Sequence, residues 1–149
     1  MRYGLDTSFL VAAELAEHPE HAASRALMAK LIAGGDQFAI APQVLAEFIH
    51  VATDARRFER PLPVEEARKL AEQWWTAREV EAVFPNGEAI KQFLDWLQMH
   101  RLGRKRLLDT LLAATYSQAG ATSLLTLNAA DFIIFGCFQC VSPTSEIEK

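Results

Sequence analysis

The segment RLLDTLLAATY, residues 106–116, places a single aspartate inside a run that is apolar on almost every side. The run is typical of a helix, and its leucines and alanines leave no polar face wide enough to meet water. A helix that is hydrophobic all round is usually buried. Burying a lone carboxylate is expensive unless a hydrogen-bond donor or a cation compensates its charge. Asp109 therefore either serves its own helix or works with groups elsewhere in the chain.

Outward from this helix, short apolar segments alternate with helical ones. The predicted strands are residues 2–6, 37–42, 78–85, 123–127 and 137–142. The predicted helices are residues 6–18, 18–36, 43–58, 64–77, 86–103 and 106–119, and a short element, NAADF, follows residue 127. Such alternation predicts an α/β fold, a three-layer α/β/α sandwich with a mainly parallel central sheet. The length of 149 residues suits one domain, residues 1–149.

The bulk composition excludes several classes of protein. Half of the chain is hydrophobic, which argues against disorder, and the net charge of -4 provides no global attraction to nucleic acid or anionic membranes. The first residues make a poor signal peptide, and no apolar run is long enough to span a membrane. We therefore expect a soluble, cytoplasmic protein. Cys137 and Cys140 form a lone CxxC, which we interpret as part of a late strand or hairpin rather than a zinc or redox site.

Polar side chains gather where the predicted strands end. Asp6 ends the first strand, Asn128 directly follows strand 123–127, and Asp131 comes three residues later. Glu47 and Asp109 lie early in helices that can bring their first turns to the same rim. Because sites in parallel sheets form beyond the carboxyl ends of the strands, we expect the four acids Asp6, Glu47, Asp109 and Asp131 to converge, with Asn128 at the end of its strand. Crowded carboxylates repel each other, and a hard divalent cation, Mg²⁺ or Mn²⁺, resolves that conflict.

Local explanations remain open for each of these residues at this point. Asp6 is suited to cap the helix that it precedes, and Asn128 with Asp131 is spaced like a capping box. Glu47 could pair with a surface arginine such as Arg56 or Arg57. Asp109 gains only about 0.3–1 kcal/mol from the dipole of its helix, which is small beside the cost of burying its charge.

Four stretches in this order resemble a PIN domain of the VapC type, the toxin of a type II toxin–antitoxin pair. They are LDTSFL (5–10), PQVLAEF (42–48), LLDTLLAATYSQAGATSLLT (107–126) and LNAADF (127–132). The resemblance implies a PIN-like fold and a metal-dependent endoribonuclease that leaves 5′-phosphate and 3′-hydroxyl ends. It also implies a cognate antitoxin partner and a homodimer.

The resemblance further implies the roles of individual residues. Asp6, Glu47 and Asp109 form the core acidic site, and a fourth position falls on either Asn128 or Asp131. Asp6 and Asp109 are the expected ligands of Mg²⁺ or Mn²⁺, and Glu47 is expected to orient or deprotonate the attacking water. The hydroxyls of Thr7, Ser8 or Thr126 are candidates for orienting water or a carboxylate.

An acidic pocket must still attract RNA. The expected contacts are Arg104, Lys105 and Arg106, just before Asp109, with a second basic cluster at Arg56, Arg57 and Arg60. A solvated loop is the alternative for each cluster. The four histidines are scattered, and the sequence assigns them no catalytic role. The helical segments 9–16 and 22–32, with the Trp74–Trp75 helix, are expected to offer an apolar groove to a partner helix.

Three other functions compete with the toxin. A receiver-like phosphotransfer domain also has an acidic Mg²⁺ pocket, but its middle strand needs an acceptor aspartate, and here that strand ends in AVFPNG. The two remaining alternatives are a PIN nuclease in RNA maturation and a catalytically inactive partner-binding module of the same fold.

Overall fold

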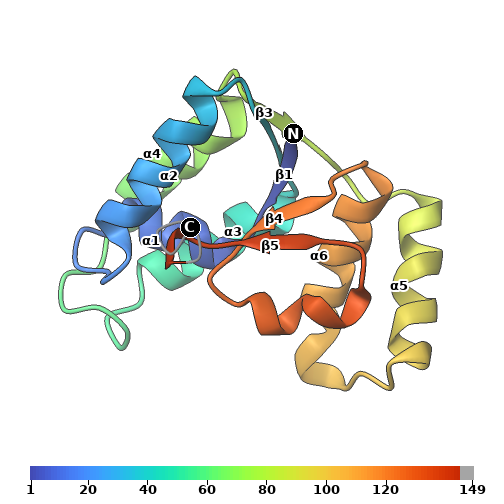
Figure 1. The fold of residues 1–149 in the computed structure, drawn as a ribbon. Helices are drawn as coiled ribbons and strands as arrows, with labels where there is room; N and C mark the ends of the chain where they lie inside the picture. The colour runs from blue at the N-terminus through green and yellow to red at the C-terminus, as the bar shows by residue number, and fades with distance from the viewer. Residues whose placement is uncertain (145–149) are drawn as a thin grey trace.

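The structure, a computed structural model, describes residues 1–144 and contains one sheet of five parallel strands (Figure 1). The strands are β1 (Arg2–Leu5), β2 (Gln37–Ile40), β3 (Val80–Ala82), β4 (Ser123–Leu125) and β5 (Gln139–Val141). Their order across the sheet is β3-β2-β1-β4-β5, and every neighbouring pair is parallel. The predicted α/β class is thus confirmed, and the sheet is parallel throughout.

Helices cover both faces of this sheet. They are α1 (Thr7–Glu14), α2 (His21–Ala33), α3 (Pro42–Ala52), α4 (Val64–Thr76), α5 (Gly87–Met99) and α6 (Leu107–Gln118). Figure 1 shows α1 to α4 on one side of the strands and α5 with α6 on the other, which makes the three predicted layers. Within residues 1–144, every helix falls short of the length and hydrophobicity that a membrane span requires.

Several predicted helix boundaries were wrong. The helix predicted over residues 43–58 ends at Ala52, and the one predicted over residues 86–103 ends at Met99. We expected one helix to run to His18 and the next to start there, but α1 ends at Glu14 and α2 begins at His21. Leu15 adopts an extended backbone, with φ of -92° and ψ of 108°, and its side chain stays buried. The chain thus leaves the helix early while Leu15 remains in the core, and residues 15–20 become a loop.

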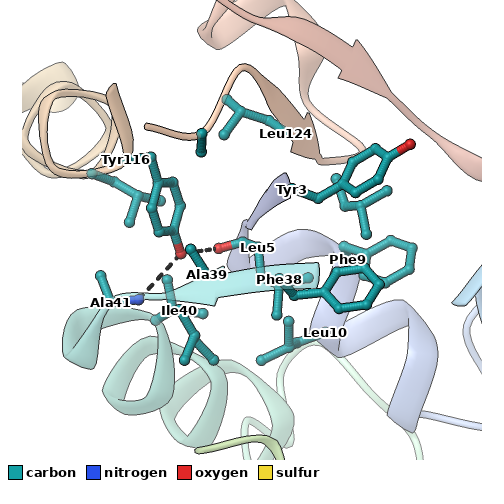
Figure 2. Close-up of a cluster of buried hydrophobic side chains, with 14 of the residues drawn as sticks. Tyr3, Leu5, Phe9, Leu10, Phe38, Ala39, Ile40, Ala41, Tyr116 and Leu124 are labelled. Atoms are coloured by element: carbon teal, nitrogen blue, oxygen red, sulfur yellow. Dashed lines mark hydrogen bonds between the residues drawn. The ribbon is translucent and has the colours of Figure 1, made fainter. Parts of the chain in front are cut away.

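The central strand is packed closely against α6. An added Cβ on Gly4 would lie 2.5 Å from Cδ2 of Tyr116 and 2.7 Å from Cδ2 of Leu124, so only glycine fits there. The Tyr116 hydroxyl is fully buried, donates to the Leu5 carbonyl at 2.5 Å and accepts from the Ala41 amide at 3.2 Å (Figure 2). Tyr116 therefore ties α6 to the ends of both β1 and β2.

The topology creates a crevice at one place along the sheet edge. From β1 the chain passes to β2 on one side, whereas β4 lies on the other side of β1. The crossovers therefore diverge at the carboxyl ends of β1 and β4, which is where ligands bind in open parallel sheets. Asp6 directly follows β1 and stands at this point. At the far side of the sheet, Cys140 lies in β5 and Cys137 just before it, which agrees with the predicted late strand.

Candidate active site

One pocket of about 730 Å³ opens at this crevice, and all five predicted site residues line it. They come from four places in the chain: Asp6 from the end of β1, Glu47 from α3, Asp109 from α6, and Asn128 with Asp131 from the segment after β4. The convergence expected from the strand-end rule is thus found in the structure.

Asp6 is the most buried carboxylate of the pocket, with only 6% of its surface exposed. Its Oδ2 accepts hydrogen bonds from the Thr126 hydroxyl at 2.7 Å and the Ser8 hydroxyl at 2.8 Å. Burial raises the pKa of Asp6, the hydroxyl hydrogen bonds lower it, and the charge of Asp131 raises it again. Asp6 stands at the N-cap position of α1 but forms no side-chain cap bond, so the capping explanation was wrong.

The two hydroxyls that hold Asp6 also fix the backbone after β4. The Leu127 amide donates to Ser8 Oγ at 2.9 Å, and the Asn128 amide donates to Thr126 Oγ1 at 2.9 Å. Ser8 and Thr126 thereby connect the start of α1 to the segment that carries Asn128. The hydroxyls orient a carboxylate, one of the two roles expected for them.

Asp109 lies in the first turn of α6 and is half-buried. Burial raises its pKa to about 6, and the nearby charges of Asp6 and Asp131 add to the rise. Arg106 opposes these effects, since its Nε lies 3.9 Å from Asp109 Oδ2. The charge of Asp109 is therefore only partly compensated within the protein.

Glu47 faces the pocket from the middle of α3. Its Oε2 accepts a hydrogen bond of 3.1 Å from the hydroxyl of Thr7. Arg56 and Arg57, which the sequence offered as partners of Glu47, instead contact Asp54, at 3.3 Å and 3.7 Å from their Nε atoms. The surface-pair explanation of Glu47 was therefore wrong.

Asn128 precedes a short 3₁₀ turn, η2 (Ala129–Asp131), and Asp131 is its last residue. Asn128 stands at its N-cap without a side-chain cap bond, so the capping-box explanation was also wrong. A second turn, η3 (Ile133–Phe135), follows, and Phe135 stacks on Trp96 of α5 at 4.5 Å between ring centroids. The segment is thus packed against α5, and it keeps Asp131 close enough for its charge to raise the pKa values of Asp6 and Asp109.

The basic cluster before α6 does not act as one surface. Arg104, Lys105 and Arg106 form a 3₁₀ turn, η1 (Arg104–Arg106), whose first two side chains are exposed and do not line the pocket. Arg106 turns inward, and one of its terminal nitrogens donates to the backbone carbonyl of Asp131. Of the second predicted basic cluster, Arg57 lines the pocket, whereas Arg56 and Arg60 do not. Sequence reasoning missed His18 and Phe58, which also line the pocket and come from two separate loops.

The donor set fits a hard cation bound by few protein ligands. In the part of the chain that the structure describes, no group of three or more acidic, histidine or cysteine side chains is arranged to hold a metal ion. Mg²⁺, however, is commonly bound through one or two carboxylates and keeps water and substrate phosphate as its other ligands. Asp6 and Asp109 provide such a pair of carboxylates, and their negative charges repel each other.

Residues 3–133 match the family profile of the PIN domain, and the chain therefore belongs to the PIN-domain family. Among curated proteins of Mycobacterium tuberculosis, Ribonuclease VapC24 is 28% identical over 93% of this chain and 94% of its own length. Ribonuclease VapC31 is 38% identical, but that match covers 46% of this chain and 48% of the relative, about half of its length.

Solved structures of similar fold include a toxin and a toxin–antitoxin complex. The Mycobacterium tuberculosis VapC20 structure, described as a sarcin-ricin loop cleaving toxin, has a TM-score of 0.68 at 20% identity and covers 91% of this chain and 95% of its own. A toxin–antitoxin complex from Klebsiella pneumoniae has a TM-score of 0.59 at 18% identity, with 95% and 97% covered. At these identities the likeness concerns the fold.

Proposed function

We propose that this chain is a metal-dependent endoribonuclease and the toxin of a type II toxin–antitoxin pair, built as a single PIN domain. The observation that carries the proposal is the pocket in which Asp6, Glu47, Asp109 and Asp131 meet at the carboxyl ends of β1 and β4. Relatives named Ribonuclease VapC support RNA as the substrate. An RNA substrate in turn favours the cytoplasm as the place of action.

Asp6 and Asp109 are the proposed ligands of Mg²⁺ or Mn²⁺. Both carboxyls have raised pKa values because burial and neighbouring acids disfavour their charges. When bound, such a cation stabilises the charge that develops on the phosphate and lowers the pKa of water. Ser8 and Thr126 hold Oδ2 of Asp6, which fixes the orientation of this carboxylate in the pocket.

Glu47 and Asp131 complete the proposed machinery. Glu47, held by Thr7, orients the attacking water and accepts its proton, so that the water oxygen bonds to phosphorus. The bond from phosphorus to the 3′ oxygen then breaks, and the 3′ oxygen takes a proton from solvent to become the 3′-hydroxyl. We assign the fourth acidic position to Asp131 rather than Asn128, since the charge of Asp131 acts on both Asp6 and Asp109. Asn128 lines the same pocket as a neutral donor and acceptor.

The antitoxin would cover an apolar groove on the helical face opposite α5 and α6. A pocket of about 280 Å³ lies among α1, α2, α4 and β3. Its apolar lining includes Ala13, Met28, Trp74 and Val80, and the charged residues Glu14 and Arg25 also line it. This apolar lining suits the apolar face of an amphipathic helix from a partner. For the homodimer, Leu108 and Ile133 are apolar side chains with 61% and 64% of their surfaces exposed that a second copy would cover.

Cleavage of a structured RNA with Mg²⁺, Mn²⁺ or EDTA tests the proposal. We expect wild-type cleavage to require a divalent cation, and Asp109→Asn to lower the rate at least about a hundredfold, because the variant loses a charged ligand. The matched control is Asp95→Asn, which removes the same charge from an exposed position on α5 outside the pocket.

Each outcome separates the competing functions. Equal cutting by wild type and Asp109→Asn would place the activity outside this pocket and contradict the assignment. Absence of cutting across several RNAs, together with normal binding of a partner protein, would favour the inactive partner-binding module. A small neighbouring reading frame whose product blocks the cleavage would favour the toxin over a nuclease of RNA maturation.

A further inference from the structure

One wall of the acidic pocket is not acidic. His18, Arg57 and Phe58 line it, and we call these three residues the loop wall. His18 comes from the loop between α1 and α2, and Arg57 with Phe58 from the loop between α3 and α4. The wall places a hydrogen-bond donor, a cation and an aromatic ring beside the carboxylates, within the same 730 Å³.

A single carboxylate joins the two loops that form the wall. Glu17 accepts the backbone amide of Glu59 at 3.1 Å and that of Arg60 at 2.8 Å, one on each of its oxygens. The two loops lie next to each other at one end of the molecule (Figure 1). Because Glu17 precedes His18 directly, this contact sets the position of His18 relative to the loop that carries Arg57.

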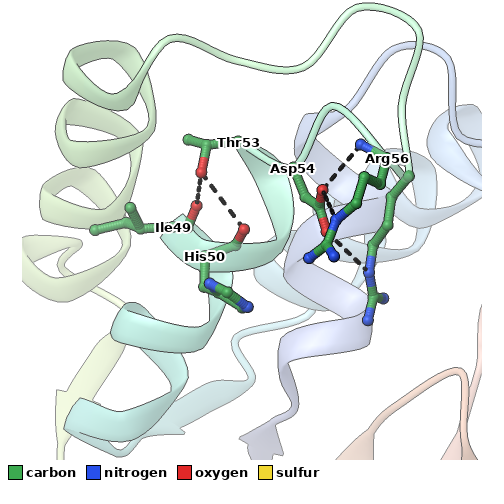
Figure 3. Close-up of polar contacts among 6 residues, drawn as sticks. Ile49, His50, Thr53, Asp54 and Arg56 are labelled. Atoms are coloured by element: carbon green, nitrogen blue, oxygen red, sulfur yellow. Dashed lines mark hydrogen bonds and ion pairs between the residues drawn. The ribbon is translucent and has the colours of Figure 1, made fainter.

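The loop after α3 is shaped by its own short-range contacts. The Thr53 hydroxyl donates to the Ile49 carbonyl at 2.7 Å and ends the helix, and Asp54 accepts the Arg56 amide at 2.9 Å (Figure 3). The amides of Arg57 and Phe58 also bond to the Asp54 carbonyl, at 3.1 Å and 3.2 Å. These hydrogen bonds within the loop fix the backbone that carries Arg57 and Phe58.

His18 offers a donor at neutral pH without carrying a charge. Its Nδ1 accepts the backbone amide of Glu20 at 3.0 Å, so the proton of the neutral ring stays on Nε2. Burial lowers the pKa of His18 below its ordinary value, which keeps the ring neutral near pH 7. A neutral N–H donor can bind a phosphate oxygen without adding a cation that would compete for the carboxylates.

Arg57 supplies the charge that His18 lacks. Its side chain is 63% exposed, and its contact with Asp54 uses Nε at 3.7 Å, too long for a hydrogen bond. The terminal nitrogens of the guanidinium are the part suited to a phosphate. Arg56, by contrast, is 88% exposed, contacts Asp54 at 3.3 Å and does not line the pocket.

We propose that the loop wall is the RNA-binding subsite next to the scissile phosphate, where His18 and Arg57 hold the adjacent phosphate of a single-stranded segment and Glu17 positions them. The inference rests on the proposed function in that RNA is the ligand. Of the two predicted basic clusters, it selects Arg57 from the second, because Arg104, Lys105 and Arg106 do not line the pocket.

The test measures binding separately from cleavage. The probe is a fluorescent single-stranded RNA of about 12 nucleotides, followed by anisotropy in EDTA across a salt series, with KM and kcat measured in Mg²⁺. We expect Arg57→Gln to raise Kd and KM about tenfold with kcat nearly unchanged, and to lower the slope of log K against log salt by about 0.7. Arg60→Gln is the matched control, since it removes the same charge from the same loop but outside the pocket.

His18→Asn separates the donor from the charge. An asparagine oxygen can still accept the Glu20 amide, whereas the donor at the position of Nε2 is lost. We expect Kd and KM to rise about fivefold while the salt slope stays unchanged, because a neutral contact releases no counterion. Glu17→Gln turns one acceptor oxygen into an amide donor facing a backbone N–H, so it should also raise Kd, and Arg57→Gln should add less in that background than alone.

Two results would overturn the subsite. One is that Arg60→Gln weakens binding as much as Arg57→Gln, which would indicate general electrostatics. The other is that Arg57→Gln and His18→Asn both bind and turn over like the wild type. Failure of the proposed function looks different, since a wild type that binds the probe through His18 and Arg57 but never cleaves would keep the subsite and reject the nuclease.

Discussion

Two buried polar groups, the Tyr116 hydroxyl and the Asp6 carboxyl, lie at the end of β1 in opposite environments. The Tyr116 hydroxyl has both of its hydrogen bonds, to Leu5 and Ala41, and no surface exposed (Figure 2). One residue further, the carboxyl of Asp6 faces a pocket where Asp109 and Asp131 raise the cost of its charge. A satisfied polar group holds a fold together, whereas crowded charges need a ligand from outside.

The same contrast is found within helix α6, between Tyr116 and Asp109. α6 carries Tyr116 at its buried end and Asp109 in its first turn, so one helix serves the core and the site. Burial raises the pKa of the Tyr116 hydroxyl and of the Asp109 carboxyl. Only the pKa of Asp109 moves toward the physiological range, to about 6. The contrast predicts that removing the polar group destabilises the protein at Tyr116 and stabilises it at Asp109.

Tyr116→Phe is expected to have the largest effect on stability. It leaves the Leu5 carbonyl and the Ala41 amide without a partner in a dry environment, which costs about 2 kcal/mol of the free energy of unfolding. Urea denaturation in EDTA measures this loss, and the cleavage rate per folded molecule should stay within about twofold. A variant as stable as the wild type would show that water or a backbone shift satisfies both groups.

Asp109→Asn is expected to change stability in the opposite direction. Without metal, the amide removes a charge that burial, Asp6 and Asp131 disfavour, so the free energy of unfolding should rise by about 1 kcal/mol. This value allows for solvent screening of a side chain that is 32% exposed. The same denaturation experiment measures it, with Asp95→Asn as the control that should change little.

Destabilisation by Asp109→Asn would contradict the contrast between Tyr116 and Asp109, because it would mean that Arg106 fully compensates the Asp109 charge in the metal-free protein. Arg106→Gln sharpens the point. Since the Arg106 charge lowers the pKa of Asp109, its removal should raise that pKa further and enlarge the stability gained on replacing Asp109 by Asn.

The smallest expected effect is a pH dependence of the same difference. The pKa of Asp109 is raised from its ordinary value of 3.8 to about 6 in the fold, so the folded state binds the proton more tightly than the unfolded chain does. Stability of the metal-free protein therefore falls as pH rises through this window. The advantage of Asp109→Asn, about 1 kcal/mol above pH 6, should shrink toward zero near pH 4.

Urea midpoints of both proteins at several pH values between about 4 and about 7.5 give this difference directly, and subtraction cancels the other acids. Excess Mg²⁺ should stabilise the wild type and remove the advantage of the variant at neutral pH, since the bound cation compensates the charge. A difference that stays constant with pH would assign the effect to packing instead of ionisation.

Much of the fold could be predicted because its signals are local. Alternating apolar and helical segments identified all five strands and six helices of residues 1–144, and the strand-end rule placed Asp6, Glu47, Asp109, Asn128 and Asp131 at one pocket. Helix ends were less certain, since Leu15 leaves its helix to stay in the core. The catalytic and metal-binding roles of the five residues stay predictions that the experiments above address.

The sequence by itself determined the order of the elements and which residue types follow each strand, because periodicity and strand-end chemistry are properties of neighbouring residues. Only the tertiary structure decided which distant residues meet. Thr126 reaches Asp6 across 120 positions, Arg106 turns toward Asp131, and Glu17 binds the loop that carries Arg57. These contacts depend on the strand order and on how each crossover packs, which no local pattern contains.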